Sequence, residues 1–272
     1  MNFALILKLF LDIIVGFFIG VAIGLTGVGG GVLVLPALIH IIGIAPISAV
    51  GTGLAYAVIT KLGGTVYHFK LKTIRIRRSF YFLVGSIPSV LISSKMVNYF
   101  AKKYSVELIN ERLQVCIGII LLTTAIMMFL QMFSVNDKER SNHILESKIL
   151  YIPFHKKMLA ILAGAIVGIL FGITSIGGGV FIIPFFMLFF DSNCKQAVGT
   201  SIFISVIISA FGGLVYLMNG NVEILPAIFL CIGSLPGVRL GSRLTEKVPE
   251  QILIMIVIIL IILSGMSMLF FR

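Results

Sequence analysis

Two glycine-rich segments contain the residues whose types and spacing could do chemistry. Residues 24–31 read Gly-Leu-Thr-Gly-Val-Gly-Gly-Gly, and residues 172–179 read Gly-Ile-Thr-Ser-Ile-Gly-Gly-Gly, each within apolar surroundings. Glycine triplets favour a break in a helix, and a helix that begins after the break presents free N–H groups and a positive dipole end. Such an end binds anions. The candidate anion ligands in the two segments are Thr26, Gly29, Gly30, Gly31, Thr174, Ser175, Gly177, Gly178 and Gly179.

Close packing of helices is the alternative explanation for the glycines. Small residues spaced by four let two helices approach each other closely, and this explanation fits Gly16, Gly20 and Gly24 better than it fits the triplets. A nucleotide-binding phosphate loop is disfavoured, because the glycines do not follow the spacing G-x-G-x-x-G and no βαβ unit surrounds them.

Further candidate ligands are hydroxyls and cations that lie within apolar stretches. Thr52, Thr200 and Ser201 follow a glycine near the start of a stretch, where they could face a substrate or cap a helix. Lys61 lies well inside one stretch, and Arg239 lies toward the end of another. Ionisable residues inside a membrane are functional candidates by default, although both side chains could instead extend to the membrane surface.

The chain matches itself at an offset of 148 residues. The matching pairs include the two glycine triplets, Pro36 with Pro184, and the Ala-Val-Gly-Thr sequences that begin at Ala49 and Ala197. Similar composition alone would not keep one offset through glycines, prolines and Gly-Thr pairs, so the chain is a tandem duplication. Internal repeats with interrupted helices at matching places are typical of secondary transporters, whose site lies at the repeat interface.

The composition places most of the chain in lipid. Hydrophobic residues make up 59% of the chain, charged residues 11%, and the mean hydropathy is +1.15, whereas a soluble domain has about 25% charged residues. The apolar residues run continuously, which favours spanning helices over a β-barrel. The net charge of +11 fits basic loops retained on the cytoplasmic side of a membrane better than a nucleic-acid surface. The sequence therefore predicts an all-α polytopic membrane protein.

We expect two repeats joined by a linker: a first transmembrane repeat over 1–133, a cytoplasmic linker over 134–157 and a second transmembrane repeat over 158–272. Five of the nine residues in 70–78 are lysine or arginine, whereas the matching loop 219–223 has no basic residue. The positive-inside rule therefore places the two loops on opposite sides of the membrane and predicts inverted repeats. The short, Gly-broken second stretch of each repeat would meet its counterpart near the membrane midplane. Five crossings per repeat would give inversion, and so would three crossings plus a re-entrant hairpin; parallel repeats with an even number of crossings remain an alternative.

Residue patterns for catalysis, metal binding or ATP hydrolysis are missing from the sequence. The three cysteines have no metal or redox spacing, the four histidines are scattered, and no Walker motif is present. We therefore expect neither enzyme activity nor a cofactor or metal. Asp12, His40 and His68 lie near segment ends and are the candidates for proton coupling.

Several of these motifs together point to a known family. The motifs are Gly-Val-Gly-Gly-Gly at 27–31 with Pro36, Ser-Ile-Gly-Gly-Gly at 175–179 with Pro184, the two Ala-Val-Gly-Thr sequences, and Pro-Gly-Val-Arg-Leu-Gly at 236–241. In these residues, and over nearly its whole length, the sequence resembles the TauE/SafE family of sulfite-exporter-like anion transporters. The resemblance implies transport of sulfite, sulfonates, sulfoacetate or a similar sulfur-containing anion across a plasma membrane.

The residues and the resemblance together predict a secondary transporter for a small organic or inorganic anion in the plasma membrane. The anion would bind between the two glycine breaks, and rocking of the repeats would give alternating access. Transport would be coupled to a proton or another ion, or would be facilitated diffusion. An anion channel is the alternative function. The expected partners are the anion, a coupled ion and the lipid bilayer, without nucleic acid, and the oligomeric state stays open.

Overall fold

The computed structural model describes residues 3–26, 31–134, 154–176, 178–190, 192, 194–244 and 250–270. Every regular element in these ranges is a helix. The helices are α1 (Phe3–Thr26), α2 (Gly31–Pro36), the π-helix η1 (Ala37–Ile41), α3 (Pro46–Lys70), α4 (Ile76–Lys103), α5 (Val106–Ser134), α6 (Phe154–Thr174), α7 (Gly178–Phe190), α8 (Cys194–Met218), α9 (Ile224–Leu244) and α10 (Glu250–Phe270). The predicted linker 134–157 therefore overlaps helix at both of its ends.

Six of the described helices are long and apolar enough to cross a membrane: α1, α4, α5, α6, α8 and α9. A helix of this kind covers ~27 Å or more at 1.5 Å per residue, close to the ~30 Å of hydrocarbon in a bilayer. Large apolar side chains such as Phe18, Ile92 and Leu130 are more than half exposed, and only lipid solvates such a surface. The prediction of an all-α polytopic membrane protein is confirmed.

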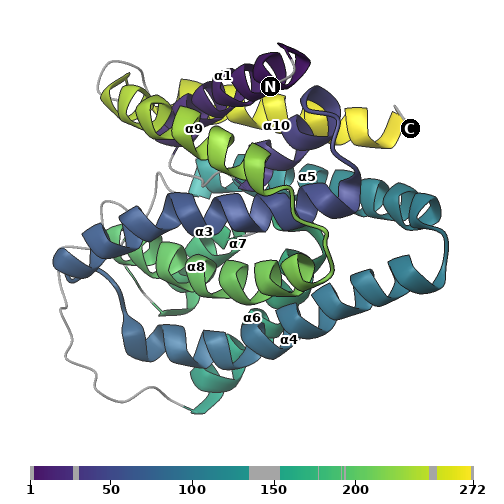
Figure 1. Ribbon diagram of the computed structural model, residues 1–272. Helices are drawn as coiled ribbons and strands as arrows, with labels where there is room; N and C mark the ends of the chain where they lie inside the picture. The colour runs from purple at the N-terminus through teal and green to yellow at the C-terminus, as the bar shows by residue number, and fades with distance from the viewer. Residues whose placement is uncertain are drawn as a thin grey trace.

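The first helix of each repeat packs against the fourth helix of the other repeat, so that α1 lies beside α9 and α6 lies beside α4 (Figure 1). A Cβ built on Gly16 would lie 2.8 Å from Cα of Leu230, and one built on Gly20 would lie 2.7 Å from Cα of Ser234. The glycines of α6 at matching positions approach the α4 backbone equally closely. The residue numbers rise together on both helices, so each pair is parallel. Close packing is thus the role of these spaced glycines.

The third helices of the two repeats, α3 and α8, pack antiparallel through the centre of the molecule (Figure 1). Gly51, near the start of α3, lies against Asn221, just beyond the end of α8. Gly199, near the start of α8, lies against His68, near the end of α3. The inversion of the two repeats stays a prediction from the sequence.

Helix α6 reaches only the middle of α4 before the chain turns back. A Cβ on Gly172, near the end of α6, would lie 2.9 Å from the carbonyl oxygen of Val90, which is near the centre of α4. After the break, α7 returns to the starting end of α4. There Nη1 of Arg78 donates hydrogen bonds to the carbonyl oxygen of Phe190 at 2.6 Å and to Oγ of Ser192 at 3.1 Å. Helices α6 and α7 therefore form a hairpin whose turn lies halfway along α4.

The second stretch of each repeat is short, as the sequence predicts. Helix α7 covers Gly178–Phe190, and α2 with η1 covers Gly31–Ile41. Pro36 has no N–H group and so cannot donate the hydrogen bond to the carbonyl four residues earlier that continues an α-helix. The chain continues as a π-helix, in which the N–H of Ile42 donates to the carbonyl oxygen of Ala37 at 3.0 Å.

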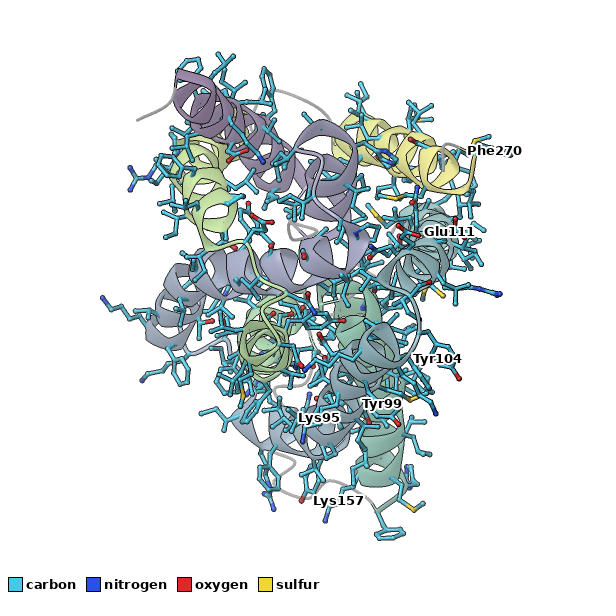
Figure 2. The ribbon with its side chains drawn as sticks, turned by 45° about the vertical axis from the view of Figure 1, so that its right-hand side comes forward. Lys95, Tyr99, Tyr104, Glu111, Lys157 and Phe270 are labelled. Atoms are coloured by element: carbon cyan, nitrogen blue, oxygen red, sulfur yellow. The ribbon has the colours of Figure 1, made fainter. Side chains whose placement is uncertain are left out.

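Tyrosine and lysine side chains gather at both ends of α4. Nζ of Lys157 lies 5.5 Å from the ring centroid of Tyr81 at one end, and Nζ of Lys103 lies 5.9 Å from the ring centroids of Tyr99 and Tyr104 at the other. Figure 2 shows Tyr99 and Tyr104 on one side of the molecule and Lys157 at its lower end. About 18 residues of helix separate Tyr81 from Tyr99, which is ~27 Å. Aromatic and basic residues at this separation are typical of the two surfaces of a bilayer.

Candidate functional site

The two glycine-rich breaks lie against each other. Helix α2 begins at Gly31, and a Cβ built there would lie 2.8 Å from the carbonyl oxygen of Ser175 and 3.9 Å from Cα of Ile176. The first break thus contacts the backbone of the second break directly. Gly29, Gly30 and Gly177, together with the side chain of Thr26, lie outside the described residues, as does the rest of 27–30.

The second break is held by hydroxyls that bond to the backbone. Ser175 has a φ of 53°, a left-handed conformation that ends α6. Oγ1 of Thr174 donates to the carbonyl oxygen of Leu170 at 2.7 Å and accepts the N–H of Ile176 at 3.3 Å. Oγ of Ser201, on α8, donates to the carbonyl oxygen of Gly178 at 2.7 Å. Thr174 and Ser201 therefore shape the break and fix the start of α7.

The ammonium of Lys61 lies at the start of α7. A Cβ built on Gly178 would lie 3.0 Å from Nζ of Lys61 and 3.0 Å from Cβ of Ser205, and Gly179 follows Gly178 in the first turn of the helix. Nζ also lies 6.0 Å from the ring centroid of Phe171. Part of the Lys61 side chain is accessible, but its charged end is surrounded by buried residues. Among the described residues, no carboxylate forms an ion pair with it.

Three buried serine hydroxyls have no hydrogen-bond partner among the described residues. They belong to Ser175, Ser205 and Ser209, which are 2%, 1% and 0% exposed. A buried polar group without a partner costs about 1–3 kcal/mol, so the hydroxyl of Ser205, which shares Gly178 as a neighbour with Lys61, calls for an explanation such as a ligand or water. Ser205 lies against Gly178, and Ser175 lies against Gly53. We call Lys61, Ser205 and the first turn of α7 from Gly178 the α7 anion cluster.

Sequence reasoning did not single out Ser205 or Ser209, the latter of which lies 148 residues after Lys61, at the matching position of the other repeat. A signal was present, because Ser201, Ser205 and Ser209 are spaced by four and so lie on one face of α8. That face turns toward the break, since Ser201 bonds to Gly178 and Ser205 lies beside it. A serine stripe opposite a glycine break is therefore the pattern that would have found them.

The hydroxyls of Thr52 and Thr200 hold the two repeats together. Oγ1 of Thr52 accepts the N–H of Glu223 at 2.9 Å, immediately before α9, and Oγ1 of Thr200 accepts the N–H of Arg75 at 3.1 Å, immediately before α4. Each threonine is fully buried and stabilises the start of a helix in the other repeat. Of the two roles that the sequence left open, helix capping is the one with described contacts.

Arg239 is exposed on α9, which packs against α1 and α3. Arg78, which sequence reasoning did not single out, stabilises the end of α7 through the carbonyl oxygen of Phe190. A separate open groove of about 500 Å³ lies along the exposed side of α1. Five apolar residues and one cation line it: Leu7, Phe10, Leu11, Ile14, Ile42 and Lys8.

The comparisons with known proteins agree with the membrane fold. The family model "Sulfite exporter TauE/SafE" matches residues 12–268. A probable membrane transporter protein of Bacillus subtilis (strain 168) is 33% identical over 258 residues, covering 94% of this chain and 98% of that protein. A probable membrane transporter protein of Methanocaldococcus jannaschii is 31% identical over 277 residues, covering 94% and 93%. No solved structure gives a significant match.

The family match covers nearly the whole chain, and the described helices provide six apolar segments that can cross a bilayer. The relatives over the same length carry the name of membrane transporters. The chain therefore belongs to the sulfite exporter TauE/SafE family, and it is a multi-pass membrane transporter.

Proposed function

We propose that this protein is a secondary transporter that moves a small sulfur-containing anion, of the sulfite, sulfonate or sulfoacetate class, across the plasma membrane. The single observation that carries the proposal is the ammonium of Lys61, which lies beside Gly178 and has no carboxylate partner in the part of the chain that the structure describes. An unpaired cation inside a membrane protein is costly, and a bound anion would remove that cost. Membership of the sulfite exporter TauE/SafE family supports a sulfur-containing substrate.

The α7 anion cluster offers three kinds of contact to one oxyanion. The first turn of α7 provides N–H groups and the positive end of a 13-residue helix. Lys61 provides a full positive charge, and Ser205 provides a hydroxyl that has no other described partner. Together these groups suit a tetrahedral or pyramidal anion with several oxygens, each of which needs its own donor.

The packing of the helices supports alternating access. The site lies next to the point where α6 and α7 turn, halfway along α4, and alternating access requires this level to lie near the middle of the membrane. Inverted repeats are supported by the antiparallel packing of α3 with α8 and by the packing of α1 of the first repeat against α9 of the second. The positive-inside rule would place the basic segment 70–78 in the cytoplasm. The close contacts around Gly178 describe a closed state, and separation of the repeats would open the site to one side at a time.

Uptake of radiolabelled sulfite or a sulfonate into proteoliposomes tests the proposal. A charge-assisted hydrogen bond contributes about 1.5–3 kcal/mol, so Lys61→Gln should weaken anion binding by roughly 10- to 150-fold. Lys95→Gln removes the same charge from an exposed position of α4 and should leave uptake unchanged. Equal uptake by both variants would overturn the assignment of the site.

Serine variants test the hydroxyl contact in the same vesicles. Ser205→Ala should weaken binding, while Ser89→Ala should not, because Ser89 already donates to the carbonyl oxygen of Gly85 in its own helix. Saturable exchange of internal for external anion is expected. A large unsaturable current instead would identify an anion channel and refute the alternating-access mechanism.

A further inference from the structure

Asp12 is a buried carboxyl group that the proposed anion site does not use. It lies within the apolar segment Leu7–Gly24 of α1 and is 0% exposed. Neither of its oxygens has a hydrogen-bond partner among the described residues. An ionised carboxylate in such surroundings loses its hydration without compensation and costs several kcal/mol. The neutral acid avoids this cost.

The register of α1 places Asp12 against α9. Gly16 meets Leu230 and Gly20 meets Ser234, and Asp12 precedes Gly16 by four residues, which is about one helical turn on the same face. Because the two helices are parallel, Asp12 lies opposite the first turn of α9, about one turn before Leu230. Because the carboxyl is buried in the packed structure, movement of α1 away from α9 would open it to water.

None of the described charged or titratable groups around Asp12 forms a hydrogen bond with its carboxyl oxygens. Lys8, one turn earlier on α1, is exposed and acts on Asp12 only through its field. On α9, Glu223 is exposed ahead of the helix, and the thiol of Cys231 is buried. On α10, which also packs against α1, Glu250 begins the helix, and no charged residue follows it up to residue 270.

We propose that Asp12 is a proton-binding site that is occupied while α1 is packed against α9 and emptied when the two helices separate. In the closed state the carboxyl keeps its proton; on opening, the O–H bond breaks, the proton passes to water and the carboxylate becomes hydrated. Transport would then move one proton with each anion, provided that the protein returns without the anion and with Asp12 ionised, so that no proton is carried back; this coupling rests on the proposed function. The matching position of the second repeat is Ala160, so only the first repeat carries this group.

Infrared difference spectroscopy on the purified full chain tests proton binding without any anion. The carbonyl band of a protonated carboxylic acid should be present at neutral pH in the wild type and absent from Asp12→Asn. It should remain in Glu223→Gln, which removes an exposed acid, and in Asp12→Glu, which keeps the proton-binding group. An acid band that persists in Asp12→Asn, or no acid band in the wild type, would overturn the proposal. Size-exclusion chromatography shows that each variant is folded.

Proteoliposomes with an inward proton gradient test the coupling. The gradient should drive accumulation of the labelled anion in the wild type, and Asp12→Asn should lose at least about tenfold of that accumulation while still exchanging anion at equal pH on both sides. Gradient-driven accumulation that persists in Asp12→Asn would refute the coupling. If wild-type vesicles exchange no anion although the acid band of Asp12 is present, the proposed transport function is refuted but proton binding at Asp12 is not. Lys61→Gln should lose uptake and keep the acid band.

Discussion

Valine variants of Thr52 and Thr200 would decide what the two Gly-Thr sequences do. Valine has the shape of threonine without the hydroxyl, so it removes the acceptors of the N–H groups of Glu223 and Arg75 and changes little else. Loss of a helix-capping hydroxyl costs about 0.5–2 kcal/mol, and a buried N–H left without a partner costs about 1–3 kcal/mol. We expect each variant to lose about 1–2 kcal/mol of stability.

The double variant should lose the sum of the two single effects. Thr52 and Thr200 lie near the starts of antiparallel helices, α3 and α8, so they act at opposite ends of the pair and share no partner. A total of about 2–4 kcal/mol corresponds to a fall in Tm of roughly 5–15 °C for a chain of this size. Circular dichroism of the detergent-solubilised protein during heating measures this change.

Thr123→Val is the matched control for this experiment. Thr123 is exposed on α5, and its hydroxyl bonds to the carbonyl oxygen of Ile120 in the same helix, so its loss should leave Tm within about 2 °C of the wild type. A wild-type Tm for Thr200→Val together with weaker anion binding would show that the hydroxyl is a substrate ligand. That result would refute the capping role.

Three further variants test the packing and the site. Gly20→Val should lower stability by at least about 3 kcal/mol in thermal unfolding, because its side chain would overlap the α9 backbone. Gly63→Ala is the control and should not lower stability, because the space around Gly63 is open. Equal stability of the two variants would contradict the close contact. The double variant Lys61→Ser with Ser209→Lys moves the cation to the matching position of the other repeat. In titration calorimetry it should restore much of the anion affinity that Lys61→Ser alone loses. No recovery would count against the equivalence of positions 61 and 209. Arg78→Gln should speed hydrogen exchange at the end of α7, since its bond to that helix is lost, and unchanged exchange would contradict this role.

The general architecture was predictable because it depends on patterns along the chain. Continuous apolar stretches predict helices in lipid, and the glycine triplets mark where α6 ends and α7 begins. The stripe of Gly16 and Gly20 predicts close packing of α1, since only a small residue lets a backbone approach to this distance. The identity of the packing partner, α9, was not predictable, because a stripe of glycines specifies closeness and not which helix comes close.

The candidate site was predictable only in part, for a related reason. The break at Gly178 and the unusual position of Lys61 are visible in the sequence, but their proximity depends on where the folded chain places the Lys61 side chain of α3 relative to the start of α7. Ser205 looks like any other small polar residue of a transmembrane helix until the break is placed beside it. Thr52 could equally have faced a substrate, since the sequence does not show that Glu223 begins the neighbouring helix at that point.

The pairing of α1 with α9 has a consequence for biogenesis. Gly16 and Leu230 are in contact although roughly 200 residues of chain separate them. At ~5–20 residues per second of synthesis, α1 waits on the order of 10–40 s before its partner leaves the ribosome. During that interval the insertion machinery or lipid must shield the glycine face and Asp12. A nascent chain truncated before α9 would therefore expose a site for quality-control proteases, whereas the α4–α6 pair would already be complete.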